Sequence, residues 1–75
     1  MADRPPLNIC GAHVRYFRNA HQWSQEELAA KCQVAGWDIS RAIVANIEGL
    51  TRKVSDRELK TLAAVLAVPI AELVA

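Results

Sequence analysis

The sequence predicts an all-α protein of five short helices, and three features of the chain carry this prediction. Two capping boxes are present, Ser24-x-x-Glu27 and Ser55-x-x-Glu58, in which serine and glutamate satisfy each other's backbone N–H groups at a helix start. Hydrophobic residues make up 52% of the chain and aromatic residues only 5%, and this aliphatic, alanine-rich balance favours packed helices over a sheet. No stretch shows the alternation of polar and apolar residues that is typical of a half-buried strand.

The first expected helix follows a short N-terminal arm. Residues 1–7 are expected to be flexible, because Pro5-Pro6 is incompatible with a helix. Asn8 is a suitable cap for a helix from about residue 9 to about residue 21. Gly11 would allow another helix to approach closely, because it has no side chain. The apolar positions that recur at helical spacing are Cys10, Val14 and Phe17.

Two helices are expected in the middle of the chain. The first begins at Gln25 and ends near residue 34 or 35, where Gly36 offers a left-handed stop. The second covers Arg41–Glu48, with Ser40 as its cap and a glycine after its last residue. Trp37, in the connection, is expected to pack back onto the core. The inward-facing side chains are expected to be Leu28, Ala29, Cys32, Val44 and Ile47.

Two more helices complete the predicted fold. The capping box at Ser55 opens the fourth helix after a loop at residues 50–54. Pro69 fits the first turn of a fifth helix, because proline lacks the N–H group that a first turn leaves unused. The expected buried stripe of the fourth helix is Leu59, Leu62, Ala63 and Leu66, and the fifth helix holds Ile70, Leu73 and Val74.

Size and charge narrow the possible functions. The 75 residues are expected to form one domain, residues 8–75, after the arm. The formal net charge is only +1, so the strongly basic balance that identifies many nucleic-acid-binding proteins is absent, although a local positive face remains possible. Neither a signal segment nor an apolar run long enough to span a membrane is visible, and a cytoplasmic location is expected.

The cysteines and histidines give no sign of catalysis. Cys10 and Cys32 fall on apolar helix faces, and in a reducing compartment we expect small buried hydrophobes without a disulfide. A metal site that joins them to His13 and His21 can be imagined, but the spacing matches no usual zinc pattern. We therefore predict no catalytic residue, no metal and no cofactor.

The two central helices point to a binding function. Two short, capped helices with apolar inner faces, in the middle of a small helical chain, are typical of a helix-turn-helix motif. Such a motif usually presents its second helix to the major groove of DNA.

Three stretches of the sequence resemble the phage repressor and Cro-like helix-turn-helix family, whose members are also called Xre-type regulators. Arg18 and the run WSQEELA at positions 23–29 are similar to the family's "R…LSQEELA". The run VANIE at positions 44–48 resembles "ISRIE", and positions 59–69 are similar to "LxxLAxxLGVP". The resemblance extends from about Asn8 to Val74 and implies a five-helix, lambda-repressor-like DNA-binding domain.

This sequence departs from the family pattern between the second and third helices. Gln33 stands where the family usually has a glycine, and several extra residues follow it, so a lengthened turn is expected. Gln22 replaces the glycine that is common in the family after the first helix, and Gly49 lies one position earlier than the family's glycine after the third helix.

The third helix is the candidate recognition helix, because its outward side chains suit contacts with base edges. Arg41 can bond a guanine bidentately, and Asn46 can do the same with adenine, while alanine can pack on a thymine methyl group. A solvated helix face is the alternative, since exposed arginine and asparagine are common. Ile43 is expected to cover the lengthened turn more readily than to touch DNA. The expected base-contacting residues are Arg41, Ala42, Ala45 and Asn46.

Phosphate contacts are expected on both sides of this helix. Gln25 begins the second helix, whose N–H groups and dipole favour an anion, and by the resemblance the matching glutamine contacts the DNA backbone. The loop after the third helix is basic, although a solvated loop is the alternative. Such contacts position a protein without reading sequence. The expected phosphate-contacting residues are Gln25, Ser40, Thr51, Arg52 and Lys53.

The resemblance also implies a partly buried ion pair between Arg18 and Glu48. It would orient the third helix against the first. Removing one partner of a buried pair leaves an uncompensated charge and costs about 3–5 kcal/mol.

We therefore predict sequence-specific binding to double-stranded DNA by a transcriptional regulator, with repression as the expected role. The resemblance implies a symmetric homodimer, for which the fifth helix and the end of the fourth, with Ile70 and Val74, are the expected surface. The alternative is a protein-binding module, antitoxin-like or coactivator-like, which the low net charge, the alanines of the third helix and Ile43 would suit. No small-molecule ligand is predicted.

Overall fold

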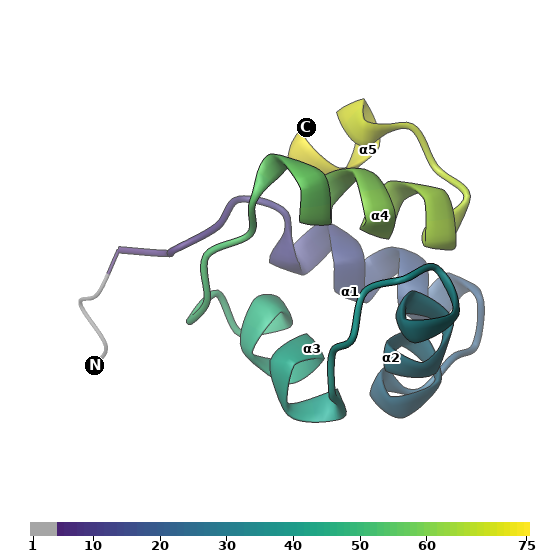
Figure 1. The fold of residues 1–75 in the computed structure, drawn as a ribbon. Coiled ribbons are helices and arrows are strands. Elements are labelled where there is room, and N and C mark those ends of the chain that lie inside the picture. Colours follow the sequence, from purple (N-terminus) through teal and green to yellow (C-terminus); the bar gives the residue numbers. More distant parts are fainter. Residues whose placement is uncertain (1–4) are drawn as a thin grey trace.

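Residues 5–75, the part of the chain that the computed structural model describes, form five α-helices and no strand (Figure 1). The predicted all-α, five-helix fold is confirmed. The helices are α1 (Gly11–Ala20), α2 (Gln25–Val34), α3 (Arg41–Glu48), α4 (Asp56–Leu66) and α5 (Ile70–Val74).

The helix α1 lies in the middle of the fold. It contacts α3, α4 and α5, while α2 contacts α3 and α4. In Figure 1, α2 and α3 lie together below α1, and α4 and α5 lie above it. The α2–α3 pair therefore forms one side of the molecule, and the remaining helices support it from behind.

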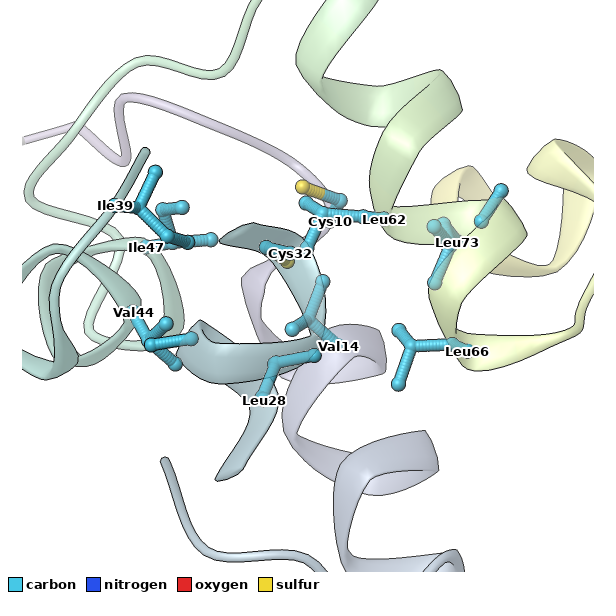
Figure 2. Packing of buried hydrophobic residues seen from close by; sticks show 12 residues of the cluster. Cys10, Val14, Leu28, Cys32, Ile39, Val44, Ile47, Leu62, Leu66 and Leu73 are labelled. Atoms are coloured by element: carbon cyan, nitrogen blue, oxygen red, sulfur yellow. The ribbon is translucent and has the colours of Figure 1, made fainter. Parts of the chain in front are cut away.

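A single hydrophobic core joins all five helices and the α2–α3 connection (Figure 2). Each helix contributes side chains, and Ile39 enters from the connection with 3% of its surface exposed. Burial of one such aliphatic side chain stabilises a fold by about 1.5–3 kcal/mol. The labelled core residues are Cys10, Val14, Leu28, Cys32, Ile39, Val44, Ile47, Leu62, Leu66 and Leu73.

Both predicted capping boxes are present, and they fix where α2 and α4 begin. The Ser24 hydroxyl accepts the Glu27 N–H at 3.0 Å, and the Glu27 carboxylate accepts the Ser24 N–H at 2.7 Å. The same two bonds at Ser55 and Glu58 are 3.1 and 3.0 Å long. Each box satisfies two N–H groups that a helix start would otherwise leave unpaired.

The Asn8 side chain binds N–H groups at the start of α1, although the residue that directly precedes the helix is Cys10. Its Oδ1 accepts the N–H groups of Gly11 at 2.8 Å and Cys10 at 3.1 Å. Its Nδ2 donates to the carbonyl oxygens of Ile47 and Arg52 at 3.1 and 2.8 Å. The helix starts at Gly11, two residues later than predicted, and the Asn8 side chain ties the chain entry to the end of α3.

The expected N-terminal arm is described only in part. Residues 1–4 of the predicted arm 1–7 lie outside the described residues. Of the remainder, the Leu7 N–H donates to the Leu50 carbonyl oxygen at 3.0 Å, so the chain already runs beside the α3–α4 loop at this point.

Among residues 5–75, three residues other than glycine adopt the left-handed conformation after helices: Gln22 with φ of 64°, Leu50 with 64° and Ala67 with 60°. Gly49 directly follows α3, as predicted, with φ of −83°, and the left-handed residue is the next one, Leu50. Side chains with a Cβ disfavour this conformation by about 1–2 kcal/mol. The helix ends are thus formed at an energetic cost that glycine would avoid.

The start of α5 also differs slightly from the prediction. Pro69 is the extended residue that precedes the helix, with φ of −66° and ψ of 150°, and does not belong to the first turn. Its fixed φ still suits the approach of the chain to the helix.

The lengthened turn at residues 35–40 is held at several points. Gly36 has φ of 98°, which is the predicted left-handed stop of α2. The Trp37 N–H then donates to the Cys32 carbonyl at 2.9 Å, and the Gln33 Nε2 donates to the Ile39 carbonyl at 2.6 Å. The Trp37 ring is half-buried against the core, as predicted. The extra length is therefore anchored to the fold.

Replacing Ala67 by glycine should stabilise the protein by about 1 kcal/mol, because the left-handed conformation no longer opposes a Cβ. Urea unfolding followed by circular dichroism would measure the change. The matched control is Ala64→Gly, an exposed site inside α4 where glycine should cost about 1 kcal/mol. Destabilisation by both changes would contradict the role assigned to Ala67.

Replacing Gly11 by alanine should destabilise the protein by about 2–3 kcal/mol through overpacking. The added Cβ would collide with the Ile47 carbonyl oxygen and lie 2.6 Å from the Leu50 Cδ2. The same substitution at Gly49, where the nearest atom would be 3.2 Å away and φ is −83°, should have much less effect. Equal loss of melting temperature in both variants would argue against a close α1–α3 approach.

Candidate nucleic-acid interface

The outer face of α3 gathers the four residues that the sequence assigned to base contacts. Arg41, Ala42 and Asn46 are exposed, and Ala45 is half-buried. Within residues 5–75 no hydrogen bond or ion pair engages the Arg41 guanidinium or the Asn46 side-chain amide. Ile43 is half-buried and packs against the core. The outer face of α3 therefore presents two polar side chains, Arg41 and Asn46, that no described residue engages.

Glu48 lies at the opposite end of α3 and joins three helices through its carboxylate. Arg18 from α1 approaches it with two nitrogens, Nε at 2.7 Å from Oε2 and Nη2 at 3.0 Å from Oε1. The remaining terminal nitrogen of Arg18 donates to the Trp23 carbonyl at 2.7 Å. Gln25 from α2 donates its Nε2 to the Glu48 Oε1 at 3.1 Å.

The Arg18–Glu48 pair at the centre of this network is buried. Arg18 and Glu48 are each 9% exposed, and the hydrogen bond from Arg18 to Glu48 raises the pKa of the guanidinium further. Among the described residues, no buried side-chain nitrogen or oxygen lacks a partner. A bidentate arginine–carboxylate pair fixes distance and angle together. The pair thereby sets how α3 lies against α1.

Arg52 has a different environment from the one that the sequence suggested. Its two terminal nitrogens lie 3.0 and 3.2 Å from the carboxylate oxygens of Glu58, and one of them also donates to the Lys53 carbonyl at 3.0 Å. Its guanidinium carbon lies 5.9 Å from the centroid of the Trp37 ring. Arg52 therefore ties the α3–α4 loop to α4 and to the lengthened turn.

The other expected phosphate contacts are surface groups. Thr51 and Lys53 are exposed, and the Thr51 hydroxyl donates to the Asn46 carbonyl at 3.3 Å. Ser40 is exposed, and its hydroxyl accepts the Ile43 N–H at 3.4 Å. Lys53 carries the one ammonium group of this loop.

Two arrangements escaped the sequence-based prediction. The first is the Arg52–Glu58 pair, although a basic residue just before a capping box was a usable signal. The second is a stack at the start of α2, where the rings of His21 and Trp23 lie 4.2 Å apart at 10° and the Lys31 Nζ lies 4.6 Å from the Trp23 ring. The His21 Nε2 lies 2.7 Å from the Leu66 carbonyl oxygen, so this histidine links the end of α1 to the end of α4.

The thiols of the protein are poor nucleophiles and poor metal ligands. Burial raises the pKa of the Cys32 thiol to about 11 and raises that of Cys10 as well. Thiols react and bind metals as thiolates, which these values disfavour at neutral pH. Residues 5–75 contain no group of three or more metal-binding side chains. In the same part of the chain, no helix has the length and apolar character that crossing a membrane would require.

A shallow hollow of about 360 Å³ lies on the outer face of α2, lined by Glu27, Ala30, Lys31 and Val34. The Glu27 carboxylate already accepts the Ser24 N–H, and Lys31 lies over Trp23. The lining thus offers few convergent polar groups to orient a small ligand.

Comparison with known protein families gives one match. A family model described as helix-turn-helix matches residues 14–73, which includes both α2 and α3. No curated protein and no solved structure matches the chain.

The Arg52–Glu58 pair should make stability depend on pH in acid. The hydrogen bond from Arg52 holds the pKa of the Glu58 carboxyl below its ordinary 4.5 in the folded protein. The unfolded chain therefore binds more protons, and the contribution of the pair, complete above about pH 4.5, is lost as the pH falls through the lowered pKa.

Melting temperatures of the protein and of Glu58→Gln between pH 7 and pH 3 would test this dependence. The decline below pH 4.5 should be smaller in Glu58→Gln, and Arg52→Met should flatten the same part of the curve. Parallel curves for all three proteins would show that the pair does not couple folding to protonation.

Proposed function

Because the chain belongs to the helix-turn-helix family of phage-repressor and Xre-type DNA-binding transcription regulators, we propose that it reads double-stranded DNA sequence-specifically with α3 in the major groove. Its family is one of regulators and generally not of enzymes. The role proposed within that class is repression. The observation that carries the proposal is an outer face of α3 on which Arg41 and Asn46 are exposed and unengaged by residues 5–75.

Base reading is assigned to the first two turns of α3. Arg41 is proposed to bond the O6 and N7 acceptors of a guanine, and Asn46 the N6 and N7 of an adenine. Ala42 and Ala45 are small, so they let the helix approach the floor of the groove and pack on a thymine methyl group. The two alanines therefore allow α3 to enter the groove deeply, so that a few side chains can reach the base edges.

Phosphate contacts are assigned to residues beside this face. Lys53 is proposed as the main ionic contact, supported by its exposure, and Ser40 and Gln25 as neutral hydrogen-bond donors. Thr51 is a weaker candidate, since its hydroxyl proton already goes to the Asn46 carbonyl. Arg52 is a weaker candidate, since contact with a phosphate would compete with its bonds to Glu58. Because Lys53 is the main cation among these contacts, the affinity for DNA should depend only modestly on salt concentration.

A homodimer is proposed on operator DNA. The exposed apolar groups Ile70 and Val74 of α5, 39% and 37% exposed, are the proposed contacts, together with the end of α4. The protomer measures 35 × 25 × 23 Å, so two copies side by side are compatible with half-sites about 34–36 Å apart.

Replacing Arg41 by alanine should relax the sequence preference at one base pair and weaken specific binding by about 1–3 kcal/mol. Replacing Lys53 by alanine should weaken binding to all duplexes about equally and lower the slope of affinity against salt by about 1. Fluorescence anisotropy with a preferred and a scrambled duplex at several salt concentrations would separate the two. An unchanged preference in Arg41→Ala would remove Arg41 from base reading.

The first experiment is selection of the purified protein on a random duplex pool at a fixed, physiological salt concentration. Enriched inverted half-sites would support a dimeric operator-binding regulator, and a single enriched half-site would support a monomeric reader. Absence of enrichment would favour the protein-binding alternative. Ile43→Asp is a poor test of that alternative, because Ile43 packs against the core and its loss would also affect folding.

A further inference from the structure

The amide of Gln25 is held in one orientation before any ligand binds. Its Nε2 donates to the Glu48 Oε1 over 3.1 Å, and Gln25 is half-buried. A carboxylate can only accept hydrogen bonds, so the glutamine has to present its nitrogen, not its oxygen, to this partner. The contact therefore decides which way the amide is turned.

We propose that Glu48 is a positioning residue for the contact between Gln25 and a DNA phosphate, an inference that rests on the proposed DNA-binding function. One N–H of the Gln25 amide is used by Glu48, and the second is left to donate to an oxygen outside the fold. An amide free to rotate would present its carbonyl oxygen to a phosphate half of the time, which is a contact between two acceptors. Glu48 removes that orientation.

Glu48 can hold Gln25 because its own carboxylate is immobile. Arg18 bonds both carboxylate oxygens, at 2.7 and 3.0 Å, and Glu48 is 9% exposed. The Oε1 atom is shared, since it accepts from the Arg18 Nη2 as well as from the Gln25 Nε2. Hydrogen bonds to an ionised acceptor are stronger than neutral ones. The rigidity of the α1–α3 ion pair is thus extended to a surface residue of α2.

The proposal also gives the Arg18–Glu48 pair a part in ligand binding. Glu48 itself touches no DNA in this scheme, and it acts through Gln25. A purely architectural pair would affect DNA affinity only through the fold, and it would not affect one phosphate more than another. The experiment therefore measures whether loss of the pair affects one phosphate contact or all of them.

The experiment compares four proteins on the selected duplex: the wild type, Gln25→Ala, the paired replacement Arg18→Met/Glu48→Leu, and the triple variant. Replacing a buried ion pair by apolar residues of similar volume often preserves a fold. We expect Gln25→Ala to lower affinity about tenfold, as for loss of one hydrogen bond to a charged group. The paired replacement should lower affinity at least as much, because it also removes the ion pair that orients α3. The triple variant should bind no more weakly than the paired replacement.

A scan with methylphosphonate, which removes the charge of one phosphate at a time, identifies the contact. The wild type should be sensitive at one phosphate to which Gln25→Ala and the paired replacement are both indifferent. The control is Lys53→Ala, which should lower affinity by the same factor in the wild type and in the paired replacement. The inference would be overturned if the paired replacement lost as much affinity as the wild type when the phosphate that Gln25 contacts is changed to methylphosphonate.

A second measurement does not depend on the paired variant folding. In the free wild type, the side-chain amide of Gln25 should have a high NMR order parameter, while that of the exposed Gln22 should be mobile. Equal mobility of the two amides would overturn the proposal. A wild type that selects no DNA sequence and shows only weak, salt-sensitive binding would overturn the proposed function as well, so the two failures are distinguishable.

Discussion

The bidentate ion pair between Arg18 and Glu48 is the interaction on which the rest of the binding surface depends. It joins the middle helix α1 to the end of α3, and each partner is 9% exposed, so neither charge has water as an alternative. Gly11 allows the two helices to come close at their other contact, where its hydrogen stands against the Ile47 carbonyl. With both points fixed, the outer face of α3 has little freedom to tilt. Its side chains are presented by a rigid support.

Such rigidity has a cost in stability, and the hydrophobic core offsets it. Burying two charges is rarely favourable in itself, and removing one of them is strongly unfavourable. The aliphatic side chains that all five helices contribute supply the opposing free energy (Figure 2). Gln22, Leu50 and Ala67 add further strain at helix ends, because each adopts the left-handed conformation with a Cβ. Burial of the core therefore offsets the cost of holding the outer face of α3 in one position.

Much of the fold was predictable from local signals. The capping boxes at Ser24 and Ser55 located two helix starts, and Gly36 located a helix end, because each of these depends on a few adjacent residues. The bonds from Asn8 to Ile47 and Arg52 were not predicted, because these residues are distant in sequence from Asn8. The partner of Arg52 was missed for a related reason. A cation in a loop is equally compatible with a phosphate and with a carboxylate, and only the fold brings Glu58 beside it.

The hydrogen bonds of Asn8 have a practical consequence for labelling or fusion. They hold the beginning of the described chain beside the loop that follows α3, whereas the other end lies beside α4 and α5, above α1 in Figure 1, and its Ala75 carbonyl bonds the His13 ring. A fluorophore or carrier protein attached ahead of Leu7 would crowd the side of the molecule that carries Lys53. A tether placed after Ala75 would leave that side open, and it is the better handle for immobilising the protein on a sensor surface.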